Sequence, residues 1–324
     1  MPLTTTHLLF ALAVVFALIS GANDGASLLA ANLSGRAFSP LTALALLTLI
    51  VIVGPFAVGT AVATTFARGL VTASGSEGTV ALAVAVGAAI AVITWTARSG
   101  LPTSVTQALL GGIVGAGLGL GFPVAWGTVA LVLALFAAAP LAAAGLAWGL
   151  THVLLRLPVR RSLAARLRNL HAVGFAAQAI AYASNDAQKL VAVFAVAAGS
   201  AVTGGTIAPD PRIQLLIGVC FAVGSLAGAA SLGGRLGGKL LVAGPLTTIA
   251  ADFGSAVAVA VSALMGSPVS TPQAASAAMI GSTIATSGRA AVRWPQAWRL
   301  VLVWFTTLPT AIALAAGIGL LIRS

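Results

Sequence analysis

Three acidic residues lie inside long apolar stretches of the chain, namely Asp24, Asp186 and Asp252. The other two acids, Glu77 and Asp210, lie in more polar stretches. A charged side chain at the centre of a bilayer costs about 2.5–3.5 kcal/mol on insertion scales, so such residues are few and usually functional. The three acids are therefore the first candidates for a binding site. The competing interpretation is a carboxylate paired with a basic residue only to hold helices together.

Two of these acids follow an asparagine, and the two Asn-Asp pairs lie 162 residues apart. Both side chains of such a pair compete for backbone hydrogen bonds, and Gly21 and Gly25 should loosen the helix around Asp24 further. We therefore expect a locally unwound helix that exposes carbonyl oxygens. Carboxylate, amide and carbonyl oxygens suit a small, hard cation such as Na⁺, although a carboxylate could take up a proton instead. The predicted cation-binding residues are Asn23, Asp24, Asn185 and Asp186.

A second polar motif also occurs twice, at 102–107 and at 268–273. Proline disfavours helix at the residue before it, and Ser or Thr caps the helix that follows. The motif predicts a half-helix that starts within the membrane, with free N–H groups and the positive end of the helix dipole available to an anion. One copy alone would favour an ordinary Pro-kinked helix; the duplication favours an anion site. The predicted anion-binding residues are Thr103, Ser104, Thr106, Ser270 and Thr271.

Two further charged residues belong to the candidate site. Lys189 follows Asp186 by three residues, so both lie on one helix face. We expect Lys189 either to pair with Asp186 or to touch the anion. Asp252 has no acidic counterpart in the first half of the chain, where Val86 holds the equivalent position. It is a second candidate for ion coupling or for an ion pair.

The composition identifies the class of protein. Of 324 residues, 59% are hydrophobic and 6% are charged, and the mean hydropathy is +1.09. A soluble domain is about 25% charged, and disorder needs low hydrophobicity, so both classes are excluded. The net charge of +11 fits cytoplasmic loops, which collect Lys and Arg, better than a nucleic-acid partner. No resident cofactor or metal site is expected apart from Na⁺, because the three histidines do not cluster and Cys220 is a lone cysteine.

Apolar segments between polar punctuation predict an all-α polytopic membrane protein with ten spans. A closed β-barrel is rejected because it needs alternating segments of about ten residues, and these runs are about twice as long. The predicted spans are 5–31, 41–66, 79–97, 103–121, 124–155, 172–200, 212–232, 240–266, 271–288 and 297–322.

The charge distribution predicts the orientation in the membrane. If both termini lie outside, the inner loops are strongly basic and the outer loops are close to neutral, as the positive-inside rule requires. The segment 156–171 carries five arginines and no acid, which predicts a cytoplasmic linker on anionic lipid. It separates two halves, 1–155 and 172–324. Five spans in each half is an odd number, so the two repeats are predicted to be inverted.

The duplicated motifs resemble those of the inorganic phosphate transporter (PiT) family of ion-coupled phosphate symporters. The family carries G-A-N-D in each half, the second copy continuing as N-D-x-Q-K; here these are 21–24 and 185–189. The family also carries P-x-S-T-T-H twice, in the places of 102–107 and 268–273. The resemblance covers nearly the whole chain. It implies re-entrant helix pairs, about twelve segments, alternating access between the repeats and frequent homodimers.

Several departures from the family pattern bear on the ligands. Val105 and Pro272 each replace a hydroxyl residue, and Gln107 and Gln273 replace histidines. The family's glutamate after the first signature is absent from 41–66. Some members resemble the family but carry sulfate, which has the same shape as phosphate.

The sequence therefore predicts a cation-coupled phosphate symporter of the cytoplasmic membrane, and not an enzyme. Na⁺ is favoured over H⁺ as the coupling ion because the asparagine oxygens help a metal ion more than a proton. A sulfate or other oxyanion permease remains an alternative, and so does a passive anion channel. An intramembrane aspartyl protease is disfavoured, because a G-x-G-D pattern is typical of that class and Asn precedes both aspartates here.

The predicted topology is testable with a single cysteine. In a Cys220→Ser background, Ser162→Cys places a thiol in the basic linker. A membrane-impermeant thiol reagent should label it only after the cells are opened, because the arginines hold this segment on the cytoplasmic side. Labelling of intact cells would invert the topology and contradict the repeat assignment.

Overall fold

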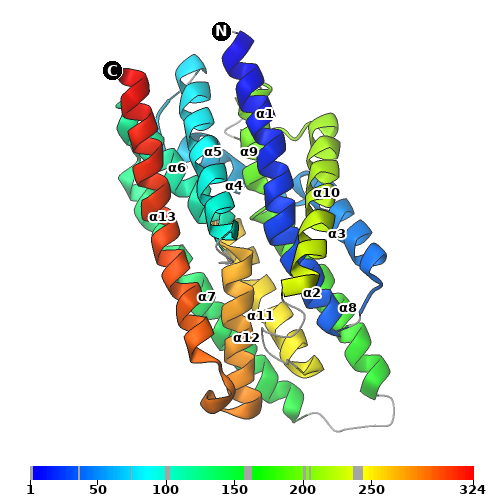
Figure 1. The fold of residues 1–324 in the computed structure, drawn as a ribbon. Helices are drawn as coiled ribbons and strands as arrows, with labels where there is room; N and C mark the ends of the chain where they lie inside the picture. Colours follow the sequence, from blue (N-terminus) through cyan, green and yellow to red (C-terminus); the bar gives the residue numbers. More distant parts are fainter. Residues whose placement is uncertain are drawn as a thin grey trace.

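The chain forms a bundle of helices with both termini at the same end (Figure 1). The structure is a computed structural model, and it describes residues 3–35, 37–73, 75–98, 103–156, 163–199, 202–203, 206–235 and 244–324. Several predicted features lie outside the described residues, among them Arg36, Pro102, Lys239 and the linker portion 157–162. The described part is almost entirely helical, as predicted. Its one sheet is a two-residue ribbon of β1 (Val202–Thr203) and β2 (Thr206–Ile207).

The helices of the first half begin with three segments that follow one another without a gap, α1, η1 and α2. The helical elements are α1 (Leu3–Ser20), η1 (Gly21–Gly25), α2 (Ala26–Gly35), α3 (Pro40–Val58), α4 (Ala61–Thr64), η2 (Thr65–Gly69), α5 (Gly75–Arg98), α6 (Val105–Leu120) and α7 (Trp126–Leu155). Both η1 and η2 are π-helical.

The second half repeats this order of long and interrupted helices. Its elements are α8 (Leu163–Ser184), α9 (Gln188–Ala197), α10 (Pro211–Arg235), α11 (Pro245–Leu264), α12 (Thr271–Ser287), η3 (Arg289–Ala291) and α13 (Trp294–Arg323). The predicted span 172–200 therefore starts earlier than expected, at Leu163, and it is broken between α8 and α9.

Every predicted span overlaps at least one helix of the described residues. Seven helices of the described residues are long and apolar enough to cross a membrane, with Thr5–Ala30 counted as one. Together with the apolar composition they make the chain an integral membrane protein. The shorter α6 is also apolar. The predicted span 41–66 is the one that ends early, because α3 stops at Val58 before Gly59, whose φ of 81° is in the left-handed region.

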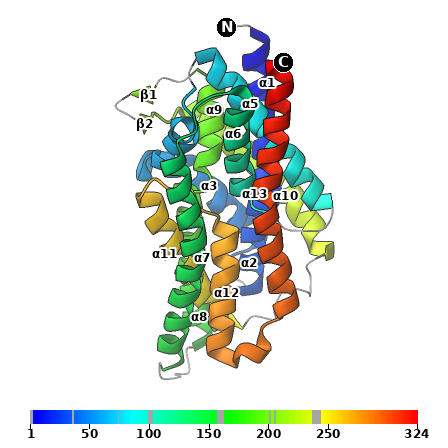
Figure 2. The same cartoon turned by 90° about the vertical axis from the view of Figure 1, so that its left-hand side faces the viewer.

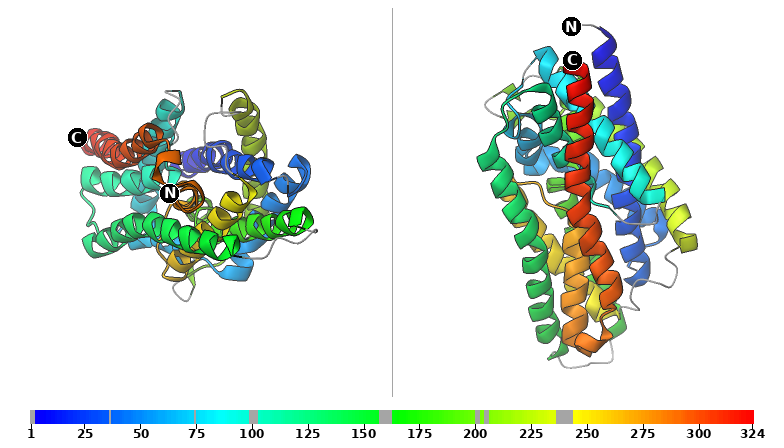
Figure 3. Two further views of the ribbon diagram at one scale, coloured as in Figure 1. Left: turned by 90° about the horizontal axis from the view of Figure 1, so that it is seen from below. Right: turned by 60° about the vertical axis from the view of Figure 1, so that its left-hand side comes forward.

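Two short helices, α6 and α12, start at mid-height and run toward opposite ends. Figures 1 and 2 show α6 in the half that holds the termini and α12 in the other half. Each follows a helix on which it packs, α5 and α11 respectively. Each also packs on the long final helix of the other half of the sequence, α6 on α13 and α12 on α7. Figure 3 shows α13 passing beside both α6 and α12.

Glycines set the close approach of these helices. On α6, Gly111, Gly115 and Gly119 face α13 so closely that a Cβ on any of them would collide with α13 atoms. On α12, Gly281 lies in the same way against the backbone of α7. Small residues at four-residue spacing allow helix backbones to pack directly in a membrane. The two short helices are thereby held against the long ones.

The glycines of the first signature have the same role, which corrects one prediction. Gly21 and Gly25 were expected to loosen the helix around Asp24. Instead, a Cβ on Gly21 would collide with the backbone of Phe221 in α10, and one on Gly25 with Ser225. The helix is not unwound here: it continues through the π-helical η1. The first Asn-Asp pair therefore lies on a widened helical turn, whereas only the second lies at a true break.

Candidate functional site

Four irregular points of the backbone meet in the middle of the bundle. They are η1, the turn between α8 and α9, and the starts of α6 and α12. Side-chain hydrogen bonds join all four of them. Apart from Asp252, the predicted site residues lie at or next to these points, so the structure brings together residues from both halves of the chain.

Lys189 is the centre of the cluster. Its side chain is fully buried, and its Nζ donates to Asp24 Oδ2 at 2.7 Å, to Asp186 Oδ1 at 3.0 Å and to Thr106 Oγ1 at 3.3 Å. An ammonium has three N–H donors and no acceptor, so these three partners satisfy it. Of the two predicted alternatives for Lys189, the structure has the pairing with Asp186. The additional bond to Asp24, which lies 165 residues away, was not predicted.

Asp186 occupies the start of α12. Its Oδ2 accepts hydrogen bonds from the backbone N–H of Thr271, at 2.8 Å, and from the Thr271 hydroxyl. Its Oδ1 accepts from the Thr106 hydroxyl at 2.6 Å. A carboxylate at a helix N-terminus is stabilised by the unpaired N–H groups and the positive dipole end. In this structure the start of α12 therefore holds an anionic side chain of the protein itself.

The two asparagines hold the extended segments that precede the short helices. Asn23 Nδ2 donates to the backbone carbonyl of Thr103 at 3.1 Å and to Asp24 Oδ1 at 2.8 Å. Asn185 Nδ2 donates to the carbonyl of Ser267 at 3.1 Å, and its Oδ1 accepts from the N–H of Val269 at 2.9 Å. The pattern is the same in both halves. Because its Oδ1 already has a partner, Asn185 does not offer a free oxygen in this conformation.

The predicted hydroxyl residues are all buried at the starts of α6 and α12. Ser104 is the N-cap of α6, its Oγ accepting from the N–H of Gln107. Ser270 is in the N-cap position of α12, but its side chain makes no capping bond. Thr103 is turned away from the aspartates, because its hydroxyl pairs with Thr307 of α13 at 2.7 Å.

Three contacts of the site were missed by the sequence analysis. Gln107 and Gln273 join the two short helices through a hydrogen bond of 3.0 Å between equivalent positions. Gln188 binds the carbonyl of Gly59 and the N–H of Ala63, which ties α9 to α4. The hydroxyl of Tyr182 lies 3.4 Å from Asp24 Oδ2, which is long for a hydrogen bond. The duplication itself could have pointed to the first contact, since both glutamines hold the same motif position.

Asp252 lies outside this cluster. Its Oδ2 is 2.9 Å from Nδ1 of His171, and both side chains are buried. Asp252, a candidate for ion coupling or for an ion pair, thus lies beside a histidine that was not considered as its partner, and the two form an ion pair only when the imidazole is protonated.

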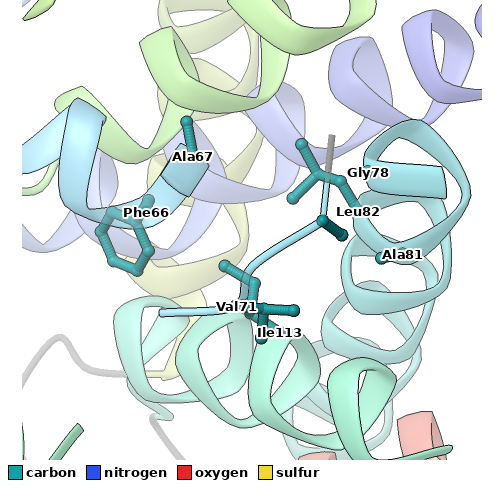
Figure 4. Close-up of a pocket in the computed structure, with 8 residues that line it drawn as sticks. Phe66, Ala67, Val71, Gly78, Ala81, Leu82 and Ile113 are labelled. Atoms are coloured by element: carbon teal, nitrogen blue, oxygen red, sulfur yellow. The ribbon is translucent and has the colours of Figure 1, made fainter. Parts of the chain in front are cut away.

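A shallow apolar hollow lies between η2 and the helices α5 and α6 (Figure 4). Phe66, Val71, Leu82 and Ile113 are among its lining residues. Its lining side chains are apolar and carry no charge, and none of its lining residues belongs to the aspartate cluster.

Comparison with known proteins identifies the family of this chain. The family described as "Phosphate transporter family" matches residues 20–173 and 161–315. The chain therefore belongs to the phosphate transporter family. Its relatives are named as transporters, which indicates transport rather than catalysis.

Curated relatives match over most of their length. A protein of Mycobacterium tuberculosis, named probable low-affinity inorganic phosphate transporter, is 32% identical over 92% of this chain and 73% of its own. A Bacillus subtilis protein of the same name is 28% identical over 97% of this chain and 96% of its own. A solved structure titled "The sodium-dependent phosphate transporter" has the same fold, with a TM-score of 0.84 at 18% identity over 99% of both chains.

The role of Lys189 in balancing the buried charge is testable by mutation. Lys189→Met keeps most of the side-chain volume but leaves two buried carboxylates without a counter-charge. Breaking a buried ion pair in this way costs about 3–5 kcal/mol, so the free energy of unfolding should fall by that order in thermal denaturation. Adding Asp24→Asn should recover part of the loss, because one unpaired charge is removed.

The matched control is Arg212→Met, which removes an exposed charge and should change the stability by less than about 0.5 kcal/mol. Equal effects of the two substitutions, or no recovery in the double variant, would contradict the assigned role of Lys189.

Proposed function

We propose that this chain is a Na⁺-coupled symporter of inorganic phosphate that works by alternating access. One observation carries the proposal: two aspartates from opposite halves of the chain share one lysine at the start of a short helix in the middle of the bundle. Two carboxylates and one ammonium have a formal charge of minus one. A buried charge of this kind attracts a further cation and repels an anion that arrives alone.

Phosphate would bind at the starts of α6 and α12. The hydroxyls of Ser104, Thr106, Ser270 and Thr271 lie there, with the N–H groups of the first helical turns. Asp186 now holds the N–H and hydroxyl of Thr271, so a bound phosphate competes with this carboxylate for the same donors. The released Lys189 and Thr106 would then be available to the phosphate.

A proton on the substrate supports phosphate over sulfate. At neutral pH, phosphate retains one or two protons and can donate a hydrogen bond to a carboxylate. Sulfate carries no proton and can only accept hydrogen bonds, so a neighbouring Asp186 repels it. A site that pairs hydroxyl donors with a carboxylate acceptor discriminates between the two anions, since an unpaired buried polar group costs about 1–3 kcal/mol.

Na⁺ is the coupling ion that this donor set favours. Asp24 and Asp186 would supply carboxylate oxygens, with an amide oxygen from Asn23 beside them. Asn185 would add a second amide oxygen once its Oδ1 releases the N–H of Val269. Inward movement of each net negative charge against an inside-negative potential costs about 2.3 kcal/mol per 100 mV. Cations in sufficient number to neutralise the phosphate must therefore accompany it. A passive channel would gain nothing from two acids at the midpoint of an anion path.

Alternating access would depend on the packing of helices from one half against helices from the other. Each half contributes one short helix and one long helix that packs on the other half's short helix. We place both termini outside the cytoplasmic membrane, so that α8 starts on the cytoplasmic side. Rocking of one half against the other would open the midpoint site first to one end and then to the other.

The proposed coupling is tested by uptake of labelled phosphate into proteoliposomes. With an inward Na⁺ gradient, the wild-type chain should accumulate phosphate, and excess sulfate should compete weakly. Asp24→Asn and Asp186→Asn should each abolish accumulation, because each removes a carboxylate that the cation needs. The matched control is Asp210→Asn, which changes an exposed acid at the start of α10 and should transport at the wild-type rate.

Two results would contradict the proposal. The first is equally fast uptake without Na⁺, driven by a proton gradient alone, which would make H⁺ the coupling ion. The second is wild-type accumulation by both Asp24→Asn and Asp186→Asn.

A further inference from the structure

A seam of buried polar side chains runs between α8 and α11. His171 and Gln178, on α8, and Asn185, just past its end, are spaced by seven residues, which is about two helical turns. They therefore lie on one face. Each meets a polar partner from α11 or the segment after it: Asp252, Ser255 and Ser267 in turn.

The seam connects one end of the molecule with the proposed site. α8 starts at the end opposite both termini (Figure 1), and His171 lies near that start. At a rise of about 1.5 Å per residue, Asn185 lies about 21 Å further along the helix axis. Asn185 is the neighbour of Asp186. Burying polar side chains inside a membrane-spanning bundle costs free energy, and such residues are usually functional. We therefore expect this line of polar side chains to have a function.

The pair nearest the start of α8, His171 and Asp252, differs in its chemistry from the other two pairs. Gln178 and Ser255 form a neutral hydrogen bond of 3.1 Å, and Asn185 binds a backbone carbonyl. His171 and Asp252 are both titratable. They are 2% and 5% exposed, and Nε2 of His171 has no hydrogen-bond partner among the described residues. Nδ1 lies 2.9 Å from Asp252 Oδ2, although not in the geometry of a regular hydrogen bond.

In the part of the chain that the structure describes, the other helices around the pair bring no permanent charge to it. The elements that pack on α8 and α11 in the described part of the chain include α2, α3, α4, α7 and α12. Their sequences contain one titratable residue, His152. Its ring stacks on Trp148 and binds the carbonyl of that residue, so it is engaged on α7. On α8 itself, Arg166 and Arg168 are exposed near the start.

We propose that His171 and Asp252 form a proton-binding site that is exposed to the pH of the side opposite the termini. The imidazole takes one proton from water and becomes an imidazolium beside the carboxylate; release returns the proton to water. The pair is then neutral with the proton and carries one negative charge without it. One carboxylate and one imidazole are too few oxygens for Na⁺, whereas an imidazole changes its charge near neutral pH.

The effect of this proton on transport rests on the proposed function. The deprotonated pair leaves a bare charge buried between α8 and α11, which favours a conformation that admits water to the seam. The protonated pair favours the closed contact seen here. The pH on that side should therefore control the opening of the transporter toward it, without altering the Na⁺ requirement.

Nuclear magnetic resonance of the purified full-length chain tests the site without transport. The chain has three histidines, so ¹⁵N-labelled imidazoles give few signals, and loss of one in His171→Gln assigns it. The His171 signal should report a change of charge as the pH is varied. The pH at which it changes should differ between the wild type and Asp252→Asn. A signal that stays in one charge state, or one that Asp252→Asn leaves unchanged, overturns the proposal.

Transport supplies the second measurement. In proteoliposomes with a fixed Na⁺ gradient, wild-type uptake should change with the pH on one side of the membrane. His171→Gln should lose this dependence and keep wild-type phosphate affinity, whereas the control His152→Gln should keep both. A pH dependence in His171→Gln equal to that of the wild type overturns the proposal. If no variant transports phosphate, the proposed function fails, and the magnetic resonance result still decides the proton site.

Discussion

Buried charge is the constraint on which the rest of this structure depends. Asp24, Asp186 and Lys189 are each at most 1% exposed, so solvent does not stabilise their charges. A buried ion that lacks a partner costs several kcal/mol, so the three side chains must stay together while the helices around them are placed. Lys189 provides the link, because it contacts an aspartate from each half.

The backbone is irregular where this cluster requires it. Asp186 lies in the turn between α8 and α9, and Lys189 lies at the start of α9. The turn brings the two side chains into contact. The starts of α6 and α12 bring hydroxyls and N–H groups to the carboxylates. The first half needs no such break, because its position equivalent to Lys189 is Ser27, which binds the carbonyl of Asn23. One lysine therefore serves two acids, and the two halves differ locally within the same plan.

Local signals in the sequence predicted the fold well. Apolar length placed the helices, and Pro with Ser or Thr marked the starts of α6 and α12, because both signals act within a few residues. The duplicated Asn-Asp pairs and serine motifs identified the residues of the cluster for the same reason.

The contacts between distant residues could not be predicted in this way. The bond from Lys189 to Asp24 spans 165 residues, and the contact of His171 with Asp252 joins two different helices. Nothing in the spacing of either residue specifies its partner. The role of Gly21 and Gly25 was misjudged for a related reason: a glycine permits a loose backbone and a close helix contact equally, and only the position of α10 decides between them.

The central claim is that the negative cluster makes phosphate binding depend on a cation, and equilibrium binding tests it most directly. Phosphate affinity of the purified chain would be measured by titration at increasing Na⁺, with choline at constant ionic strength. The account predicts that Na⁺ strengthens phosphate binding by about 5–150-fold, the usual range for coupled sites, and that phosphate strengthens Na⁺ binding by the same factor. A phosphate affinity that does not change with Na⁺ would contradict the account.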